Sequence, residues 1–390
     1  MRILLLCDRY PNSYRDGLLL RVLHLARALR RNHQVDLLCF HDGLAEGDAQ
    51  EIFGRIWTLP PPSRQTKRGL LGFITDWDPR SLHPCSQAAI NLLAEEINPQ
   101  NYDAVWDAGA MMFHHLPRSW NSVPVVADLV DDMVLTYWRA MLTESTLLAK
   151  LRMFKYGAIN LLFERYIMRR VTHCVVVSAD DHSTFRRVSP TVPASIIKNG
   201  VDINYFAPGN METIPGRLVF EGSMVFPPNH QAALYLANVI MPTIWTQRPD
   251  ATLTLVGRDP TPDILALAND RIFVTGAVED IRPYVWEAEV FVCPLQSGAG
   301  IKNKLLQAWA MGKSVVATNL SIAGLGARNG ENIRIADNTD EISKAALELM
   351  IDKDQRKILG KNGRILVETE FTWQSQANLF SKLIENLIQE

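Results

Sequence analysis

The sequence has few cysteines, no excess of charge of either sign and no long apolar run. Its five cysteines form no Cys-x-x-Cys pair and have no histidine at zinc-ligand spacing, which argues against a disulfide framework and a cysteine-based zinc site. The nine histidines form no HxxxH or HxE pattern, so we expect no metal. Lys and Arg number 40 against 42 Asp and Glu, and this balance gives no reason to expect nucleic-acid binding.

The absence of long apolar runs bears on where the protein is located in the cell. No stretch approaches the ~18 apolar residues of a membrane-spanning helix, and the run at residues 3–7 is too short for a signal-peptide core. Four of the five cysteines lie in apolar runs, as small buried side chains do in proteins of a reducing compartment. We therefore expect a cytoplasmic protein.

The composition is that of a globular protein with a large core. Hydrophobic residues make up 47% of the 390 residues and charged residues 21%. At about 150 residues per domain, this length predicts two domains.

The first forty residues alternate between strand and helix patterns. Residues 3–7 have the apolar pattern of a buried strand, 8–17 form a turn-rich loop that ends at Gly17, and 18–31 have a helical apolar period. A second strand is predicted at 34–40. We expect four arginines to lie off the apolar face of the helix: Arg21, Arg27, Arg30 and Arg31. The strand–helix–strand order predicts a parallel sheet.

The same alternation continues to the end of the chain and is interrupted once, by the Gly-, Pro- and Asn-rich stretch at 199–210. Further strands are predicted at 104–106, 123–129 and 174–178, and then at 218–220, 252–256, 272–274, 290–293 and 315–318; residues 229–245 are amphipathic. We predict an α/β fold with Rossmann-like domains at 1–200 and 201–370. A C-terminal helix at 371–390 could cross back to the first domain.

Residues 293–318 are the most informative stretch. A buried strand ends in a Gly-rich loop, a helix of about ten residues begins near Ile301, Gly312 closes it, and another strand follows. This order directs backbone N–H groups and the positive end of a helix dipole to the carboxyl edge of the sheet, where phosphate-bearing ligands bind. Lys302 and Lys304 add positive charge. A tight turn with solvated lysines remains the alternative.

Residues 274–318 resemble the nucleotide-sugar half of family 4 retaining glycosyltransferases of the GT-B fold. The closest likeness is to bacterial sugar transferases of exopolysaccharide gene clusters, which read Gly-x-Gly-Ile-x-Asn-Lys-x-Leu-Glu-Ala at the loop and helix. The resemblance extends over nearly the whole chain and includes the N-terminal strand, loop and helix and residues 174–178, 199–208, 220–229 and 255–258.

The resemblance implies two Rossmann-like domains that face each other across a cleft. It also implies transfer of a sugar, with retention of configuration, from a UDP- or GDP-sugar to a saccharide or lipid-linked acceptor, without a metal or other cofactor. Two rival functions remain open. One is a nucleotide-sugar epimerase or hydrolase of the same fold, and the other is a binding or scaffold subunit that has lost turnover.

The sequence departs from the family pattern at the donor site. Two family glutamates, eight positions apart, correspond to Ala299 and Gln307, and the loop at 222–229 lacks the family's Arg and Lys. The resemblance therefore assigns the diphosphate to Lys304, supported by Lys302 and by the N–H groups of 298–301. The other residues implied for the donor are Gly17, Gly222, Ser223, Arg258, Ala277, Val278, Ser297, Gly298, Ala299, Gly300, Ile301 and Gln307.

On the acceptor side, Asp131 follows a predicted strand and matches the region of a family histidine. It could orient an acceptor hydroxyl or take its proton, or it could cap the following helix. Asp131 and Lys304 are the candidate catalytic residues. The remaining acceptor-side candidates are Arg15, Asp16, Arg21 and Asp128.

Residues 150–170 combine six basic residues and one acid with interleaved apolar residues. This segment could bind an anionic membrane surface, where a lipid-linked acceptor would lie. Alternatively, its apolar face packs on the sheet and its charges are solvated.

Overall fold

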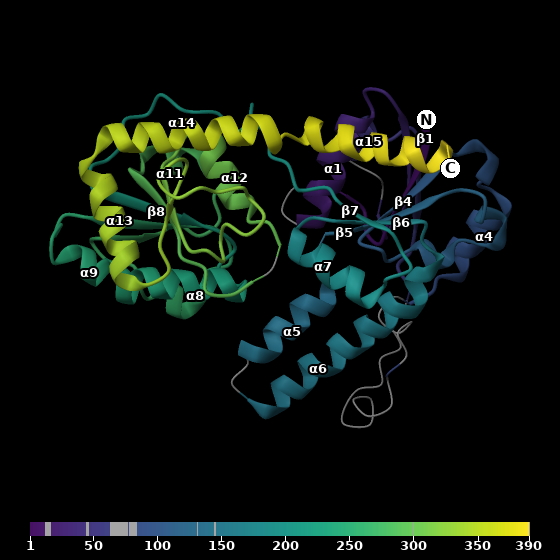
Figure 1. The fold of residues 1–390 in the computed structure, drawn as a ribbon, viewed down its shortest axis with the longest axis horizontal. Helices are drawn as coiled ribbons and strands as arrows, with labels where there is room; N and C mark the ends of the chain where they lie inside the picture. The colour runs from purple at the N-terminus through teal and green to yellow at the C-terminus, as the bar shows by residue number, and fades with distance from the viewer. Residues whose placement is uncertain are drawn as a thin grey trace. The chain divides into compact units, whose positions relative to one another are not determined.

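The computed structural model describes residues 1–11, 17–43, 47–62, 77, 84–130, 132–143, 146–298 and 300–389. The chain divides into two compact units (Figure 1). The first comprises Met1–Asn199 with Trp373–Glu390, and the second comprises Gly200–Thr372. Each unit is built on one parallel sheet with helices packed against it, which confirms the predicted α/β fold class.

The first unit contains a seven-stranded sheet in the order β3-β2-β1-β4-β5-β6-β7, and all neighbouring strands are parallel. The strands are β1 (Arg2–Cys7), β2 (Gln34–Phe40), β3 (Ile56–Leu59), β4 (Ala104–Ala108), β5 (Val125–Leu129), β6 (His173–Val176) and β7 (Ala194–Ile196). The five strands predicted in this part of the sequence are present, and the sequence analysis missed the two edge strands, β3 and β7.

The described part of the first unit also contains helices. They are α1 (Gly17–Leu29), α2 (Asp48–Ile52), α4 (Gln87–Glu95), α5 (Met133–Thr143), α6 (Leu147–Leu162), α7 (Ala179–Val188) and α15 (Trp373–Gln389), with short 3-10 turns at Pro99–Asn101, Phe113–His115 and Arg118–Trp120. Helix α6 continues into one π-helical turn at Phe163–Ile167 and a 3-10 turn at Met168–Arg170.

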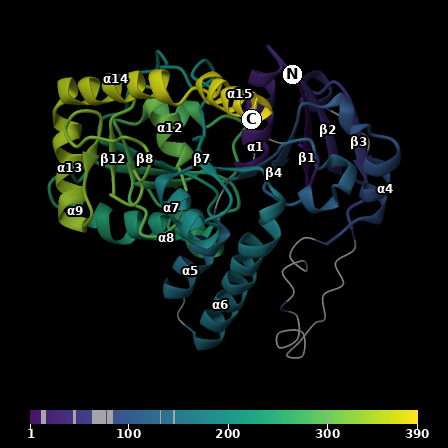
Figure 2. The ribbon, with the colours of Figure 1, turned by 45° about the vertical axis from the view of Figure 1, so that its right-hand side comes forward.

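The C-terminal helix α15 packs on α1 although the two are far apart in sequence (Figure 2). Trp373 stacks on His24 with ring centroids 5.1 Å apart, and Phe380 contacts Trp106 of β4 at the same centroid distance. Ala377, Phe380 and Ile384 are buried in the core of the first unit. The last helix of the chain is therefore part of the first unit.

The second unit contains a six-stranded parallel sheet in the order β10-β9-β8-β11-β12-β13. Its strands are β8 (Arg217–Glu221), β9 (Thr252–Val256), β10 (Ile272–Val274), β11 (Val290–Cys293), β12 (Val315–Ala317) and β13 (Arg334–Ile335). The five predicted strands are confirmed, and the two-residue strand β13 is too short to leave a pattern.

Helices of the second unit are α8 (Pro227–Tyr235), α9 (Met241–Trp245), α10 (Pro262–Leu265), α11 (Arg282–Glu287), α12 (Asn303–Ala310), α13 (Thr339–Ile351) and α14 (Lys353–Glu370). A π-helical turn at Leu236–Ile240 joins α8 to α9. Within the described residues, none of the helices combines the length and the apolar content needed to cross a bilayer.

One prediction about α1 is wrong. Arg21 was expected on the solvent side with the other arginines, but its side chain is fully buried. Its guanidinium pairs with Asp128 of β5, with Nε 2.9 Å from Oδ2 and 3.1 Å from Oδ1. This partner is 107 residues away in the sequence, so the helical pattern of α1 carried no sign of it.

Candidate functional site

In the second unit, the direction of winding reverses at β8. The chain runs from β8 outward to β9 and β10, and then returns to place β11 on the other side of β8. The connection after β8 therefore leads toward one edge of the sheet, and the connection after β11 leads toward the other. In open parallel sheets, such a reversal leaves a crevice at the carboxyl ends of the strands, and ligands bind there.

Lys304 brings a positive charge to this edge of the sheet. It lies in the first turn of α12, and its Nζ donates to the carbonyl oxygen of Glu221 at 2.5 Å and to Oδ1 of Asn229 at 2.7 Å. The ammonium also lies 4.4 Å from the centroid of the Phe220 ring. Sequence reasoning singled out Lys304 but not Asn229, which entered only as the last residue of the 220–229 stretch that carries the resemblance.

Two glycines allow the backbone to approach closely here. A Cβ on Gly222 would lie 2.6 Å from both Lys304 Nζ and Asn229 Nδ2, and a Cβ on Gly257 would lie 1.9 Å from the Gly222 carbonyl oxygen. Their φ angles, +154° and +148°, also favour glycine. The amide of Gly222 donates to the Val256 carbonyl at 2.9 Å, so the ends of β8 and β9 meet backbone to backbone.

The Gly-rich loop after β11 has two glycines with positive φ, +112° at Gly298 and +69° at Gly300. Helix α12 begins at Asn303 rather than near Ile301, so its first turn lies two residues later than predicted. Lys302 is the N-cap residue, and its Nζ donates to the Gly300 carbonyl at 2.9 Å. Lys302 thus binds a carbonyl of its own Gly-rich loop, whereas Lys304 binds the carbonyl of Glu221 at the end of β8. Ala299 lies outside the described residues.

The other donor-side candidates of the second unit lie on α12 or in loops after the strands. Gln307 is half-buried on α12, and Ser223 follows β8. Ser297 donates to the side chain of Gln231 at 2.9 Å. Arg258 follows β9 with its side chain 46% exposed, and Ala277 and Val278 follow β10. Since carboxyl ends of parallel strands share one edge, the fold places these loops around that edge.

The local electrostatics at this edge favour an anion. Desolvation raises the pKa of Glu221, and the nearby Lys304 ammonium offsets part of that rise. Within the described residues, Lys304 directs two of its three N–H bonds to protein oxygens, which leaves one donor for a ligand. A cation beside the first turn of α12 supplies the positive charge that a phosphate group requires.

The first unit has an equivalent reversal, between β1 and β4. Gly17 is the first residue of α1, and a Cβ there would meet nothing within 4 Å, so no steric reason demands glycine. Arg15, Asp16 and Asp131 lie outside the described residues.

The buried pair of Arg21 and Asp128 has further hydrogen-bond partners, although Arg21 Nη2 has none among the described residues. Arg21 Nη1 donates to the carbonyl of Lys198 at 2.9 Å and to Oδ1 of Asn199 at 3.1 Å, and the indole of Trp106 donates to Asp128 at 3.2 Å. Both side chains of the pair are 0% exposed. This geometry favours a structural role over the predicted acceptor contact, because the pair ties α1 to β5 and to the end of the first unit.

Two further carboxyls near these strand ends were not among the site residues predicted from the sequence. Asp132 caps α5, since its Oδ1 accepts from the amide of Leu135 at 2.8 Å, and burial raises its pKa to about 6. Asp107 of β4 accepts from the amides of Met112 and Phe113, and burial raises its pKa to about 7. The sequence analysis left open that Asp131 caps the following helix, and in the structure Asp132 caps α5.

A group of possible metal ligands in the described residues consists of Cys85, His114 and His115. Both nitrogens of His115 already have hydrogen-bond partners, at 2.8 Å to the amide of Ser86 and 2.9 Å to the carbonyl of Met112. The arrangement therefore fits packing of the loop after β4 better than a three-ligand site.

Comparisons with known proteins agree with this architecture. The family model "Glycosyltransferase Family 4" matches residues 16–205, and the model "Glycosyl transferases group 1" matches residues 215–352. An uncharacterized glycosyltransferase of Methanocaldococcus jannaschii is 29% identical over 124 residues, which make up 31% of this chain. The matched region spans 32% of that relative's length.

Two solved structures share the fold across both units. Sucrose-phosphate synthase from Thermosynechococcus elongatus matches with a TM-score of 0.72 and 18% identity over the full length of both chains. Anabaena HepE in complex with UDP-glucose matches with a TM-score of 0.67 and 14% identity over 99% of this chain and 100% of the other. At such identities the likeness establishes the fold alone.

Proposed function

We propose that this chain, which consists largely of two glycosyltransferase domains of the GT-B fold, transfers a sugar from a nucleoside-diphosphate sugar to an acceptor hydroxyl with retention of configuration. The donor is held by the second unit and is a UDP- or GDP-sugar. The UDP-glucose in the complex of HepE supports this choice of donor class.

The observation that carries the proposal is the position of Lys304. Its ammonium lies at the carboxyl end of β8, beside the strand reversal and in the first turn of α12. As the sugar leaves, negative charge develops on the nucleoside diphosphate. Lys304 and the N–H groups of the Gly-rich loop and α12 would stabilise that charge, so the reaction we propose needs no metal ion.

The acceptor is held by the first unit. We propose a saccharide or a lipid-linked acceptor, with Asp131 orienting its hydroxyl or taking its proton. Attack on the face from which the diphosphate leaves would retain the anomeric configuration. The pathway we favour is bacterial polysaccharide or glycoconjugate synthesis at the cytoplasmic side of the membrane.

Gln307 in place of the family glutamate supports a second candidate, a nucleotide-sugar-binding subunit without turnover. Glutamine can hydrogen-bond ribose hydroxyls, but it lacks the charge that strengthens such bonds. A nucleotide-sugar epimerase or hydrolase remains the third candidate, and it differs from the first in that it consumes the donor without an acceptor.

A donor screen separates these candidates. The purified protein is incubated with UDP-, GDP- and dTDP-sugars, with and without saccharide acceptors, and products are followed by mass spectrometry in the presence and absence of EDTA. Transfer that survives EDTA supports the proposal. Donor breakdown or epimerisation without an acceptor indicates the third candidate, and tight donor binding without any product indicates the binding subunit.

Calorimetric titration with the donor identified in the screen tests the role of Lys304. Lys304→Met should weaken binding about 5- to 150-fold, since a charge-assisted contact contributes ~1–3 kcal/mol. Lys344→Met, at an exposed lysine of α13, is the matched control and should bind as the parent protein does. Equal affinity of the Lys304 variant and the control would refute the assignment.

A further inference from the structure

Helices α5 and α6 form an antiparallel hairpin that extends away from the sheet of the first unit (Figures 1 and 2). Asp132 caps the start of α5, and the Thr146 hydroxyl caps α6 by accepting from the amide of Ala149 at 3.3 Å. The two helices contact each other through Tyr137 and Tyr156, whose ring centroids are 5.6 Å apart. The hairpin is thus a defined element with its own caps and interface.

The hairpin exposes an unusual amount of apolar surface. It provides seven of the 23 exposed large hydrophobic side chains in the described part of the chain, although it holds under a tenth of the sequence. These seven are Trp138, Leu142, Leu147, Leu148, Leu151, Phe154 and Leu161, with exposed fractions from 41% to 74%. The most exposed of them, Leu142, Leu147 and Leu148, flank the connection between the helices.

Four of the five exposed large apolar residues of α6 form one stripe. Leu147, Leu151, Phe154 and Leu161 follow the three- and four-residue spacing of a single helix face. A stripe of this kind normally packs against a protein core. The opposite side of the helix does so through Ile159, which is 2% exposed, and Phe163 in the following turn, which is 4% exposed. Core packing, left open for this segment by the sequence, therefore accounts for only one of its two apolar faces.

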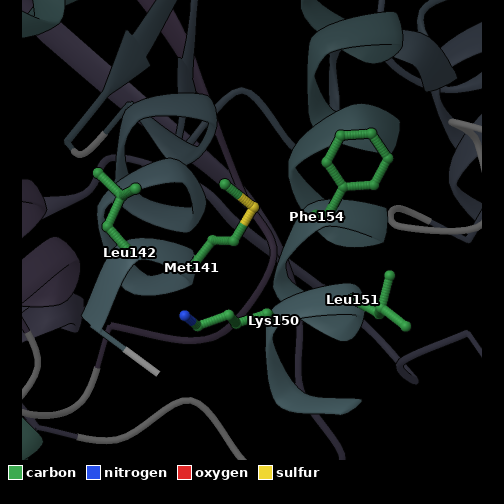
Figure 3. Close-up of a pocket in the computed structure, with 5 residues that line it drawn as sticks. All are labelled: Met141, Leu142, Lys150, Leu151 and Phe154. Atoms are coloured by element: carbon green, nitrogen blue, oxygen red, sulfur yellow. The ribbon is translucent and has the colours of Figure 1, made fainter. Parts of the chain in front are cut away.

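A hollow of about 450 Å³ opens between the two helices near their connection (Figure 3). Met141 and Leu142 line it from α5, and Lys150, Leu151 and Phe154 line it from α6. The side chain of Lys150 extends toward α5, and the other lining residues are apolar. An apolar hollow with a cation at its rim matches the chemistry of a lipid, whose acyl chain is apolar and whose headgroup can be anionic.

The charge of the hairpin identifies its partner. Residues 133–162 contain four basic residues and one acid, Glu144, within a chain whose net charge is −2. Lys150 and Arg152 are exposed on α6, where their stems can lie along lipid while their charges reach the headgroups. A second copy of the chain would bring like charges together, so the combination of apolar and basic groups favours an anionic bilayer over self-association.

We propose that the α5–α6 hairpin binds the first unit to an anionic lipid bilayer. Leu142, Leu147 and Leu148 enter the interface first, and Lys150 and Arg152 bind lipid phosphates. This inference does not depend on the proposed sugar transfer, because it concerns lipid binding by a surface of the first unit alone.

Vesicle co-sedimentation tests the proposal with the full-length protein. Vesicles of phosphatidylcholine alone are compared with vesicles that also contain phosphatidylglycerol, at low and high salt. The protein should bind the anionic vesicles, and salt should weaken the binding. Failure to bind anionic vesicles at low salt would overturn the proposal.

Two variants separate the contributions. The triple variant Leu147→Ser, Leu148→Ser, Phe154→Ser should lose binding to anionic vesicles. The variant Lys150→Gln, Arg152→Gln should bind about 30-fold more weakly, since each basic residue near the surface contributes about 1 kcal/mol. Wild-type binding by either variant would contradict the assignment.

Controls address folding and self-association. Ile351→Ser and Ile358→Ser remove exposed apolar residues of the second unit, with exposed fractions of 80% and 55%, and should not change vesicle binding. Circular dichroism and size-exclusion chromatography accompany every variant. If the triple variant only converts a dimer into a monomer, while the parent binds no vesicles, the surface is an interface between copies and the proposal is wrong.

Insertion has a separate optical readout. Trp138 is 55% exposed and lies four residues before Leu142, on the same face of α5. Brominated anionic lipid should quench its fluorescence, and the variant Trp138→Phe should lose that part of the quenching. Equal quenching in the two proteins would show that α5 does not enter the bilayer and would overturn the inserted geometry.

Discussion

Asp107 should make the stability of the first unit depend on pH. Its side chain is fully buried in β4, next to the strand reversal, and in the described part of the chain its hydrogen bonds come from the amides of Met112 and Phe113 rather than from a cation. Burial raises its pKa from 3.8 to about 7, although the two backbone hydrogen bonds lower it in part. Between about pH 4 and pH 7 the folded state therefore holds a proton that the unfolded chain has already lost.

The direction and size of the effect follow from this difference. Below about pH 4 both states are protonated and Asp107 has no influence on stability. Between about pH 4 and pH 7 only the folded state keeps the proton, so the free energy of unfolding falls as the pH rises. A pKa increase of about three units corresponds to about 4 kcal/mol, at about 1.4 kcal/mol per unit, and this loss is complete above pH 7.

Asp107→Asn removes the titration and keeps the main acceptor, because Oδ2 of Asp107 accepts from both amides, at 3.0 Å and 2.7 Å, and Oδ1 accepts only a longer contact from the Met112 amide, at 3.2 Å. Relative to the parent, the variant should gain up to about 4 kcal/mol between pH 4 and pH 8. Other buried carboxyls with raised pKa, such as Asp132, are present in both proteins and largely cancel in the comparison.

Hydrogen exchange followed by mass spectrometry measures this difference in peptides that span β1 and β4, from pH 5 to pH 8. These peptides report on the first unit, which matters because a chain of two units need not unfold in one step. Asp42→Asn, at an exposed carboxylate of the same unit, controls for the loss of one charge. A variant-to-parent difference that is constant with pH, or that grows as the pH falls, would refute the reasoning.

Three further outcomes follow from the contacts. Gly257→Ala places a Cβ 1.9 Å from the Gly222 carbonyl oxygen and should lower the free energy of unfolding of the second unit by at least ~2 kcal/mol, measured by urea denaturation; unchanged stability would show that β8 and β9 can separate freely. Asp128→Ala leaves the Arg21 guanidinium buried without its counter-charge and should cost the first unit about 3–5 kcal/mol, measured by hydrogen exchange; a loss below 1 kcal/mol would mean that water reaches the pair. Gln307→Glu should tighten donor binding about fivefold if this side chain meets the ribose, since a charged acceptor strengthens a hydrogen bond by roughly 1 kcal/mol; weaker binding in the calorimeter would show that the site has adapted to glutamine.

The sequence by itself determined the architecture. Ten buried strands were predicted at the places where the structure has them, because a strand of a parallel sheet is covered on both faces and leaves a continuous apolar run. The Gly-, Pro- and Asn-rich stretch after residue 199 predicted a boundary near residue 200, and the two compact units meet between Asn199 and Gly200. The edge strands β3, β7 and β13 were missed because they are short and have partly exposed residues.

Part of the candidate site was also visible in the sequence. The order of strand, Gly-rich loop and helix at 293–318 is local, so its residues follow one another in the chain and predict a phosphate-binding edge. The two-residue error at the start of α12 has a local cause, since the extended backbone of Lys302 delays the helix until Asn303.

Only the tertiary structure decided what each charged side chain does. Lys304 is placed by Glu221 and Asn229, which lie 83 and 75 residues away, and Arg21 is buried because Asp128 meets it from β5. No local pattern encodes such partners, although they determine whether a charge can leave water. The same holds for the α5–α6 hairpin, because an apolar helical stripe has the same spacing whether it packs on a core or faces outward, and only the packed chain shows which face remains uncovered.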